Sequence, residues 1–277
     1  MRAPSLAGKT LRLALMALAA VWSLAPIALI VLSSVKPPLE IFAIPPTLVF
    51  EPSFASYHRL LEVWPGFLPN MLNSVIVTAG ATVITVAAAF LAGYVYSRCD
   101  NWALTTSAFF MILIRMMPPI IVTLPMFPVI NWLGLNDTHL VLMLFYAAFF
   151  VSLATWILRA FIDQIPRELE EAAVIDGAGL RQILLRVVLP LVGNGLVAAS
   201  IFVVVFAWNE YFFALIFTTR EARTTPLIIA EILSTVEGVD WGILFAAATV
   251  QLVPILVFVI AVQRYVVAGL TASAVKG

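Results

Sequence analysis

Long hydrophobic stretches dominate the chain and determine its predicted architecture. Five of them contain no Asp, Glu, Lys or Arg, namely Leu13–Val35, Met71–Ser97, Thr138–Leu158, Val187–Asn209 and Trp241–Gln263. A helix rises ~1.5 Å per residue, so about 20 apolar residues cross the ~30 Å hydrocarbon core of a bilayer. A sixth stretch, Trp102–Ile130, is interrupted by Arg115 alone. We therefore predict an all-α membrane protein forming a single domain, with six transmembrane helices over residues 11–35, 71–98, 102–131, 138–160, 187–217 and 241–267.

The composition supports a membrane protein and argues against other classes. Of the 277 residues, 63% are hydrophobic and 11% are charged, whereas soluble domains are about 45–50% apolar and about 25% charged. The formal net charge of zero gives no reason to expect binding to nucleic acid. The single cysteine, Cys99, excludes an internal disulfide, and His58 and His139 lie too far apart to suggest a metal site. Continuous rather than alternating hydrophobic runs disfavour a β-barrel.

Lys and Arg residues are distributed unevenly between the connections of these helices. With the N-terminus placed inside, ten of the 15 lie on the inner side, four lie on the outer side, and Arg115 lies within a helix. Connections rich in Lys and Arg remain in the cytoplasm. The bias predicts that both termini and residues 161–186, the inner loop, face the cytoplasm. Residues 218–240, the outer loop, are expected on the opposite side.

Prolines make the third hydrophobic stretch irregular. Pro118, Pro119, Pro125 and Pro128 each remove a backbone donor from it. Broken helices at membrane depth occur where they are buried in protein or line a cavity. Two interpretations remain open, a kinked packing helix and a helix beside a translocation path. Arg115 in this stretch costs about 2.5–3.5 kcal/mol at the bilayer centre, so it must face protein or water.

The inner loop has the pattern of two short helices joined by a glycine turn. Proline and acidic residues favour a helix start, because acids complement the positive end of a helix. Here Pro166 precedes three acids, Glu168, Glu170 and Glu171. The sequence Asp176-Gly177-Ala178-Gly179 then ends the first helix. A second helix over residues 180–188 leads to Leu189-Pro190 at the next membrane span.

The apolar residues of the first short helix suggest a function for this loop. Leu169, Ala172, Ala173 and Ile175 are expected to form a small protruding surface. Such a surface beside the membrane suits the docking of a soluble partner. The alternative is an ordinary amphipathic connector that lies on the lipid headgroups.

Several motifs together resemble one family. The order Glu171-Ala172-Ala173, Gly177, Leu189-Pro190 resembles the EAA loop of membrane subunits of bacterial ABC importers. Most of the chain resembles the carbohydrate branch of that family, and especially its maltose-type second permease. The motifs that carry this further resemblance are Lys36-Pro37-Pro38, Asn70 to Ser74, Arg115 with Pro118-Pro119, Leu133-Gly134-Leu135, Trp208-Asn209-Glu210, Asp240-Trp241-Gly242, Gln263-Arg264-Tyr265 and the tail over residues 269–277.

The resemblance implies a permease subunit of a type I ABC importer that moves a sugar or related polyol across the bacterial inner membrane. It implies four kinds of partner: a second permease in a heterodimer, two cytoplasmic ATPase subunits, an extracytoplasmic solute-binding protein and membrane lipid. The ATPases would hold ATP and Mg²⁺, so no cofactor, metal or enzymatic activity is expected in this chain. Gly8-Lys9-Thr10 resembles the end of a phosphate-binding loop, but Ala3 stands where that pattern needs glycine.

The same resemblance assigns roles to residues of the two loops. It implies seven residues that couple to the ATPase, namely Glu171, Ala172, Ala173, Asp176, Gly177, Leu189 and Pro190. Glu171 is expected to meet a basic residue of the ATPase, while Gly177 permits the turn. The outer loop is implied to contact the binding protein, and the tail Thr271–Gly277 is implied to contact the ATPases.

Four polar residues in or beside the hydrophobic stretches are candidates for the substrate pathway, namely Arg115, Asn209, Glu210 and Gln251. Arg115 either pairs with Glu210 or binds carbonyl groups freed by the neighbouring prolines. Polar amides in membrane helices most often form interhelical hydrogen bonds. Two other classes remain as alternatives to an ABC permease. They are an ion-coupled secondary carrier, although neither repeats nor midplane acids are found, and a membrane scaffold without a path.

Overall fold

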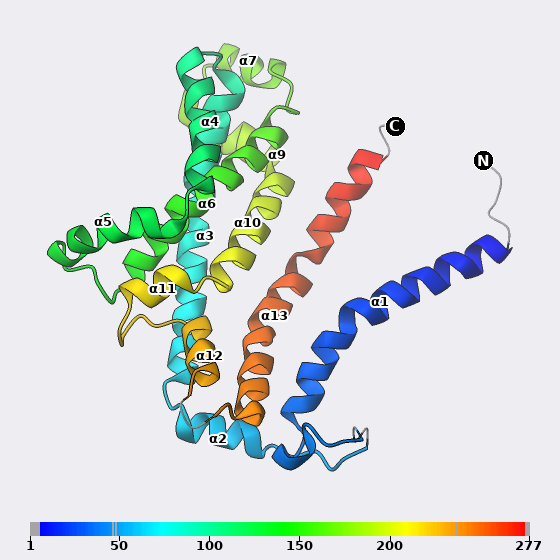
Figure 1. Cartoon of the computed structure of the whole chain (residues 1–277). Helices are drawn as coiled ribbons and strands as arrows, with labels where there is room; N and C mark the ends of the chain where they lie inside the picture. The colour runs from blue at the N-terminus through cyan, green and yellow to red at the C-terminus, as the bar shows by residue number, and fades with distance from the viewer. Residues whose placement is uncertain (1–5, 46, 48, 236–237, 275–277) are drawn as a thin grey trace. The chain divides into compact units, whose positions relative to one another are not determined.

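The computed structural model describes residues 6–45, 47, 49–235 and 238–274, and these residues form helices and no strand. Four helices are long and apolar enough to cross a membrane, namely α1 (Leu6–Ser34), α3 (Phe67–Arg98), α6 (His139–Ile162) and α13 (Trp241–Ala274) (Figure 1). Two bent helix pairs raise the number of spans to six if each pair is one span. The predicted all-α membrane fold is confirmed.

The chain divides into two compact units. The first comprises residues 1–68 and 229–253, and the second comprises residues 69–228 and 254–277. In the first unit, an ion pair joins Arg59 of α2 (Ala55–Val63) to Asp240, and the hydroxyls of Ser34 and Tyr57 lie 2.7 Å apart. The short helix η1 (Pro38–Glu40) lies between α1 and α2. No residue in the most hydrophobic window of α1 is buried, so lipid or another chain must cover this helix.

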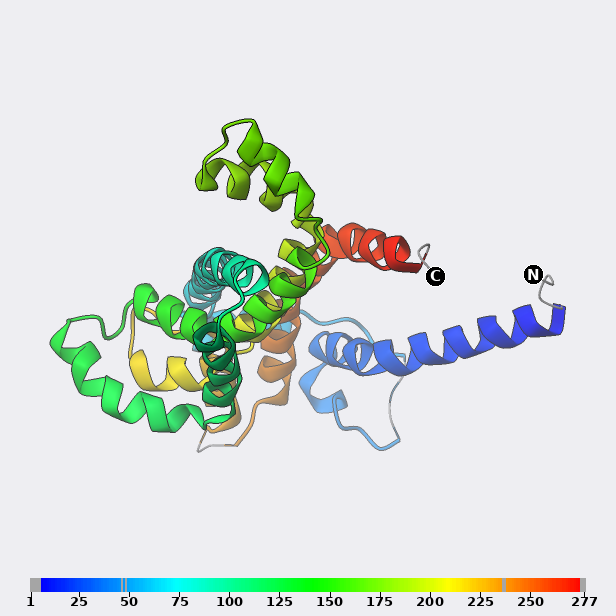
Figure 2. The ribbon, with the colours of Figure 1, turned by 90° about the horizontal axis from the view of Figure 1, so that it is seen from above.

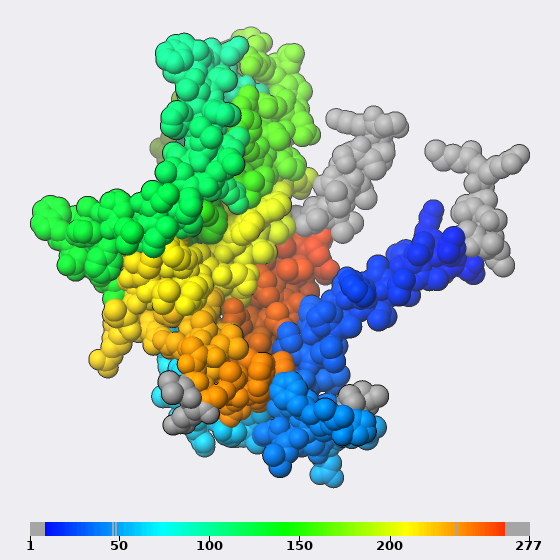
Figure 3. All heavy atoms as spheres, viewed as in Figure 1, coloured from blue at the N-terminus to red at the C-terminus, as the bar shows by residue number. Residues whose placement is uncertain are grey.

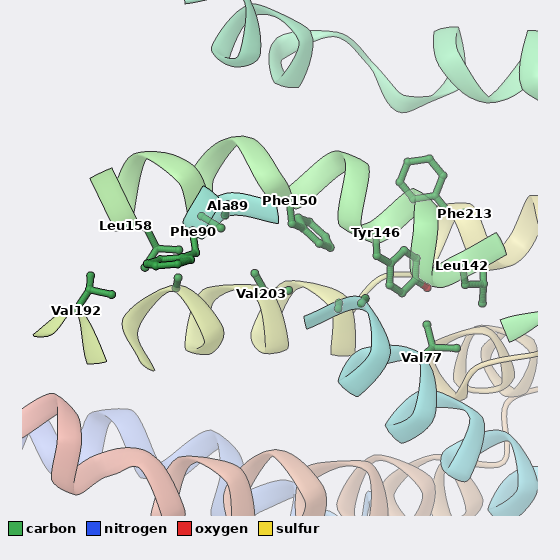
Figure 4. Packing of buried hydrophobic residues seen from close by; sticks show 14 of the residues in the cluster. Val77, Ala89, Phe90, Leu142, Tyr146, Phe150, Leu158, Val192, Val203 and Phe213 are labelled. Atoms are coloured by element: carbon green, nitrogen blue, oxygen red, sulfur yellow. The ribbon is translucent and has the colours of Figure 1, made fainter. Parts of the chain in front are cut away.

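The second unit is built on α3, α6 and α10 (Gly193–Trp208) (Figure 4). Small residues at the contacts let helix backbones approach closely, as is usual between membrane helices. A Cβ atom at Gly93 of α3 would lie 3.1 Å from the backbone nitrogen of Arg159 on α6, and one at Gly80 would lie 2.5 Å from the sulfur of Met143. The helices therefore cannot separate or slide without disturbing buried contacts. The labelled core side chains are Val77, Ala89, Phe90, Leu142, Tyr146, Phe150, Leu158, Val192, Val203 and Phe213.

The stretch predicted as one helix over residues 102–131 is divided in the structure. α4 (Trp102–Met116) and α5 (Pro119–Trp132) meet at 92°. Met117 and Pro118 are extended, with ψ of 137° and 132°, because a residue that precedes proline is disfavoured in the helical region. Two consecutive prolines thus convert the expected kink into a full break.

The stretch predicted as one helix over residues 187–217 is also divided. α8 (Leu180–Gln182), the π-helix η2 (Ile183–Val188) and α9 (Leu189–Leu191) meet α10 at a bend of 77°. Pro190 donates no hydrogen bond and its ring crowds the preceding turn, which accounts for a wide π-helical turn before it. After α10, a second break separates α11 (Phe212–Phe217), whose Phe213 amide donates to the Glu210 carboxylate at 3.0 Å.

The last helices follow the outer loop. α12 (Thr225–Leu233) begins within that loop, and α13 passes through Pro254 without a break and extends to Ala274, beyond the predicted end at residue 267. The predicted ATPase-contact tail, Thr271–Gly277, ends outside the described residues, because residues 275–277 are not among them.

Candidate functional site

The inner loop forms a helix–turn–helix, as the sequence predicts. α7 (Glu168–Ile175) ends at Asp176, and Gly177 follows with φ of +83°. The Ala178 amide donates to the Ala173 carbonyl and the Gly177 amide donates to the Val174 carbonyl, each at 2.9 Å. This pair of bonds is the Schellman motif, which places a left-handed residue directly after a helix. Glycine is favoured at Gly177 because a Cβ atom makes that conformation costly.

The tip of the inner loop exposes apolar side chains. Figure 2 shows α7 and the helical turns after it extending from the second unit, and Figure 3 shows their surface at the same end of that unit as α4. Ile175 is 86% exposed and Val174 is 59% exposed. Ala172, Glu171 and Asp176 are exposed as well. Ala173 was predicted to join this surface, but it is half-buried and packs against the core.

The base of the inner loop is held by a buried ionic network that sequence analysis missed. Glu170 and Arg98 side chains are each 11% exposed, and Arg98 Nη2 lies 2.7 Å from Glu170 Oε1. The Tyr94 hydroxyl donates to Glu170 Oε2 at 2.8 Å, and Arg98 Nη2 donates to the Ile165 carbonyl at 3.0 Å. Glu170 therefore fastens α7 to the end of α3. Among three nearby acids in the sequence, nothing distinguishes the buried Glu170 from the exposed Glu168 and Glu171.

The other end of the inner loop joins the core through Leu189-Pro190. Val188 and Val192 are fully buried on either side of this pair, while Leu189 is half-buried against the core and Pro190 is exposed. A displacement of the tip can therefore reach the core through η2 and α9 as well as through the Glu170–Arg98 ion pair and the short link to α6 at the base of the loop.

The pathway candidate Arg115 does not pair with Glu210. Its guanidinium lies 5.6 Å from the ring centre of Phe206, and no ion pair joins it to an acid among the described residues. Arg115 lines a cavity of about 200 Å³ between α4, α5, α6 and α11, together with Phe149 and Ser152. A cation over an aromatic ring is stabilised by the ring quadrupole, which accounts for an arginine in this apolar setting.

Two of the other pathway candidates make local contacts within their own segments. Glu210 caps α11, and Asn209 donates to the Val205 carbonyl of its own helix at 2.8 Å. Gln251 belongs to the first unit, whereas the other three belong to the second. Within the described residues, no group of three His, Cys, Asp or Glu side chains could hold a metal ion.

A second polar cluster, also missed by sequence analysis, lies where the outer loop begins. The Asp137 carboxylate accepts hydrogen bonds from the backbone amides of residues 219–222 and from the Thr219 hydroxyl, all at 2.9–3.1 Å. Burial alone would raise the pKa of Asp137, but these donors lower it well below its usual range. Asp137 itself has φ of +59°, a conformation in which Asp is tolerated. One carboxylate thus orders four consecutive loop residues.

Replacement of Asp137 by asparagine is expected to expose the start of the outer loop to trypsin. The asparagine NH₂ group would face amide donors, and the loss of about 1.5 kcal/mol of charged hydrogen bonding raises the open population roughly tenfold. Cleavage at Arg220, whose side chain is 89% exposed, is measured on the purified, tagged chain. Asn131→Ala is the control, because among the described residues the Asn131 side chain bonds only the Asn136 side chain. Equal cleavage of both variants would contradict this role.

The effect of pH on residues 219–222 follows from the lowered pKa of Asp137. The folded Asp137 has a lower pKa than the unfolded chain, so its stabilisation is present above ~3.9, the ordinary Asp value. It is lost only as pH falls through the folded pKa. Amide exchange of residues 219–222 is therefore expected to show the same protection at pH 5 as at pH 7. Loss of protection between those values would exclude Asp137 as the anchor.

Known proteins resemble this chain over most of its length. Residues 84–272 match the family described as binding-protein-dependent transport system inner membrane component. The trehalose/maltose transport system permease protein MalG of Thermococcus litoralis is 34% identical over 234 residues, covering 84% of each chain. The trehalose transport system permease protein SugB of Mycobacterium tuberculosis is 37% identical over 230 residues, covering 82% of this chain and 84% of its own.

A solved structure shares the fold at lower identity. It is a bacterial ABC transporter involved in the import of the acidic polysaccharide alginate, and one of its chains matches with a TM-score of 0.75 at 20% identity. The match covers 96% of this chain and 99% of the other. At this identity the likeness establishes the fold alone.

Proposed function

The chain belongs to the family of binding-protein-dependent transport system inner membrane components, and from that premise we propose that it carries a saccharide or related polyol inward as a permease subunit of an ABC importer. The relatives named for trehalose and maltose support a saccharide as the solute. The chain is a membrane-spanning subunit, so the hydrolysis of ATP belongs to separate ATPase subunits.

The observation that carries the proposal is the construction of the inner loop. Its base is locked by Glu170 and Arg98, while its tip presents Ile175, Val174 and Ala172 to a partner. An apolar side chain that is almost fully exposed on a rigid turn suits insertion into a groove of another protein. Glu171 makes no side-chain hydrogen bond or ion pair within the described residues, which leaves its carboxylate available to a basic residue of the ATPase.

The distribution of Lys and Arg supports the orientation of the chain in the membrane, and the exposed surface of α1 supports the remaining partners. The excess of Lys and Arg on the inner side supports cytoplasmic termini in the bacterial inner membrane. The uncovered apolar surface of α1 supports packing against lipid and a companion permease. The outer loop would meet the solute-binding protein that the family name requires.

The decisive experiment reconstitutes the chain with its companion permease, ATPases and binding protein. We expect the ATPases to copurify with the chain, and ATP hydrolysis to rise when solute-loaded binding protein is added. Solute uptake by the chain alone, driven by an ion gradient, would favour a secondary carrier instead. Absence of both ATPase binding and uptake would leave a membrane scaffold.

Glu171→Lys is expected to reduce uptake roughly tenfold. It reverses the charge that would pair with the ATPase, and a rim charge pair of this kind contributes on the order of 1.4 kcal/mol. Labelled-solute uptake and retained ATPase are measured together. Glu168→Lys, on the same helix and also exposed, is the matched control. Equal uptake by the two variants would remove Glu171 from the docking contact.

A further inference from the structure

The outer end of α3 is bonded to the segment in which the outer loop begins. Asn73 Nδ2 donates to the carbonyls of Glu221 at 2.8 Å and Arg223 at 3.0 Å. The Asn73 Oδ1 atom lies 2.7 Å from His139 Nε2, at the start of α6. The neighbouring Ser74 hydroxyl accepts from the Thr225 amide at 2.8 Å. These bonds, which we name the outer clamp, fix residues 221–225 to α3.

The inner end of the same helix is bonded to the inner loop. Tyr94 and Arg98 both bind the Glu170 carboxylate, and Arg98 also binds the Ile165 carbonyl. Arg167 donates in turn to the Ser97 carbonyl at 3.3 Å. We name this set the inner clamp. Its central pair is nearly buried, so it is screened less by salt than a surface ion pair.

Between the two clamps α3 is a continuous helix. It contains no proline after Pro69, and the length from Asn73 to Arg98 is about 37 Å at the helical rise of ~1.5 Å per residue. This length exceeds the ~30 Å hydrocarbon core, so the clamps lie near opposite membrane surfaces. Close contacts at Gly80 and Gly93 hold the middle of α3 against α6. A stiff helix of this kind moves as one body.

From these contacts we propose that α3 is a strut that transmits the state of the outer loop to the inner loop. The identity of the two partners, a binding protein outside and ATPases inside, rests on the proposed function. A binding protein that shifts residues 221–225 would displace α3, together with the α6 helix packed against it, through Asn73 and Ser74. The inner clamp would then tilt α7 through Glu170 and change how its tip sits in the ATPase. Asn73, Ser74 and Arg98 are positioning residues in this scheme, since each acts through its bonds to one of the two loops.

The strut predicts how the effects of breaking the outer clamp and the inner clamp combine. A coupling free energy between two sites typically corresponds to a factor of 5–150 in affinity or activation. If both clamps lie on one route, breaking either one removes the same coupling, and breaking both removes no more. If the sites communicate by separate routes, the two losses multiply instead.

The test measures ATP hydrolysis by the assembled transporter, with and without saturating solute-loaded binding protein. Asn73→Leu, which removes the donors and the acceptor at similar volume, is expected to lower the stimulation ratio roughly 5- to 10-fold, with basal hydrolysis retained. Arg98→Lys, which loses the bidentate geometry of arginine, is expected to lower the ratio similarly. The double variant is expected to match the lower of the two single variants. Asn131→Ala removes a side chain that bonds Asn136 and neither clamp, and this variant is expected to respond like wild type.

Two results would overturn the proposal. One is normal stimulation of the Asn73→Leu transporter, and the other is a multiplicative loss in the double variant. Ser74→Ala, which removes a single hydroxyl, provides a second outer variant, and the amount of ATPase retained reports assembly in every case. A wild-type chain that binds no ATPase would overturn the proposed function and the strut with it, whereas a stimulated wild type with unchanged variants would overturn the strut alone.

Discussion

Glu170→Ala is expected to abolish uptake and to lower the stability of the protein. The substitution leaves the Arg98 guanidinium nearly buried without its carboxylate partner, and breaking such a pair costs about 3–5 kcal/mol. The helix α7 would lose its ionic link to α3 and its bond to the Tyr94 hydroxyl, so the inner loop would hold its tip less firmly. Labelled-solute uptake and the thermal stability of the purified chain are the measurements.

The matched control for this prediction is Glu168→Ala, two residues away on the same short helix. Glu168 is exposed, so its removal should change stability by less than about 0.5 kcal/mol. Glu170→Gln should fall between the two, because the amide can still accept from the Tyr94 hydroxyl while the charge is lost. Equal uptake by the Glu170→Ala and Glu168→Ala variants would show that the ion pair does not support the inner loop.

Gly177→Val is expected to reduce uptake roughly 30-fold. A non-glycine residue in the left-handed region costs about 2 kcal/mol, which corresponds to that factor in the population of the correct turn. An added Cβ atom would meet no atom within 4 Å, so the effect is expected from backbone conformation and not from a clash of that atom within the chain. Uptake and retained ATPase are measured in parallel.

Gly179 provides a closely matched control for this second prediction. It is also exposed and also has no atom within 4 Å of an added Cβ, but its φ is −77°. Gly179→Val should therefore fold normally, since valine accepts an extended backbone. At position 177 the loss should rank Val, Ala, Asn, because Asn tolerates the left-handed region best. A loss that increased with side-chain volume at both positions would indicate steric contact with the partner instead.

The broad fold could be read from the sequence because hydrophobic length is a local property. A run of about 20 apolar residues needs no knowledge of its neighbours to predict a membrane helix, and α3 and α6 lie where the pattern placed them. The turn at Gly177 was likewise predictable, since an Asp-Gly pair after an acidic helix start is a local signal. The prolines at 118 and 119 predicted a disturbed helix but not its bend of 92°, and the breaks at residues 192 and 209–211 were not predicted.

The long-range polar bonds could not be predicted in the same way. Glu170 and Arg98 are 72 positions apart, and Asp137 and Thr219 are 82 positions apart. Neither pair produces a periodic pattern in the sequence. Resemblance to a family directed attention to Glu171 at the exposed tip, whereas burial singled out the adjacent Glu170. Of the two alternatives for Arg115, the structure does not show the pairing with Glu210, because Glu210 caps α11 and Arg115 lies over Phe206.

The sequence alone determined that this chain crosses a membrane several times through helices and carries a glycine-hinged inner loop, because both features depend on neighbouring residues only. Tertiary structure alone decided which acid anchors that loop, which carboxylate orders the outer loop, and that α3 is bonded to both. The physical reason is that a buried polar group must find its partner in space, and the helices that bring the partners together are packed by apolar contacts far from either group.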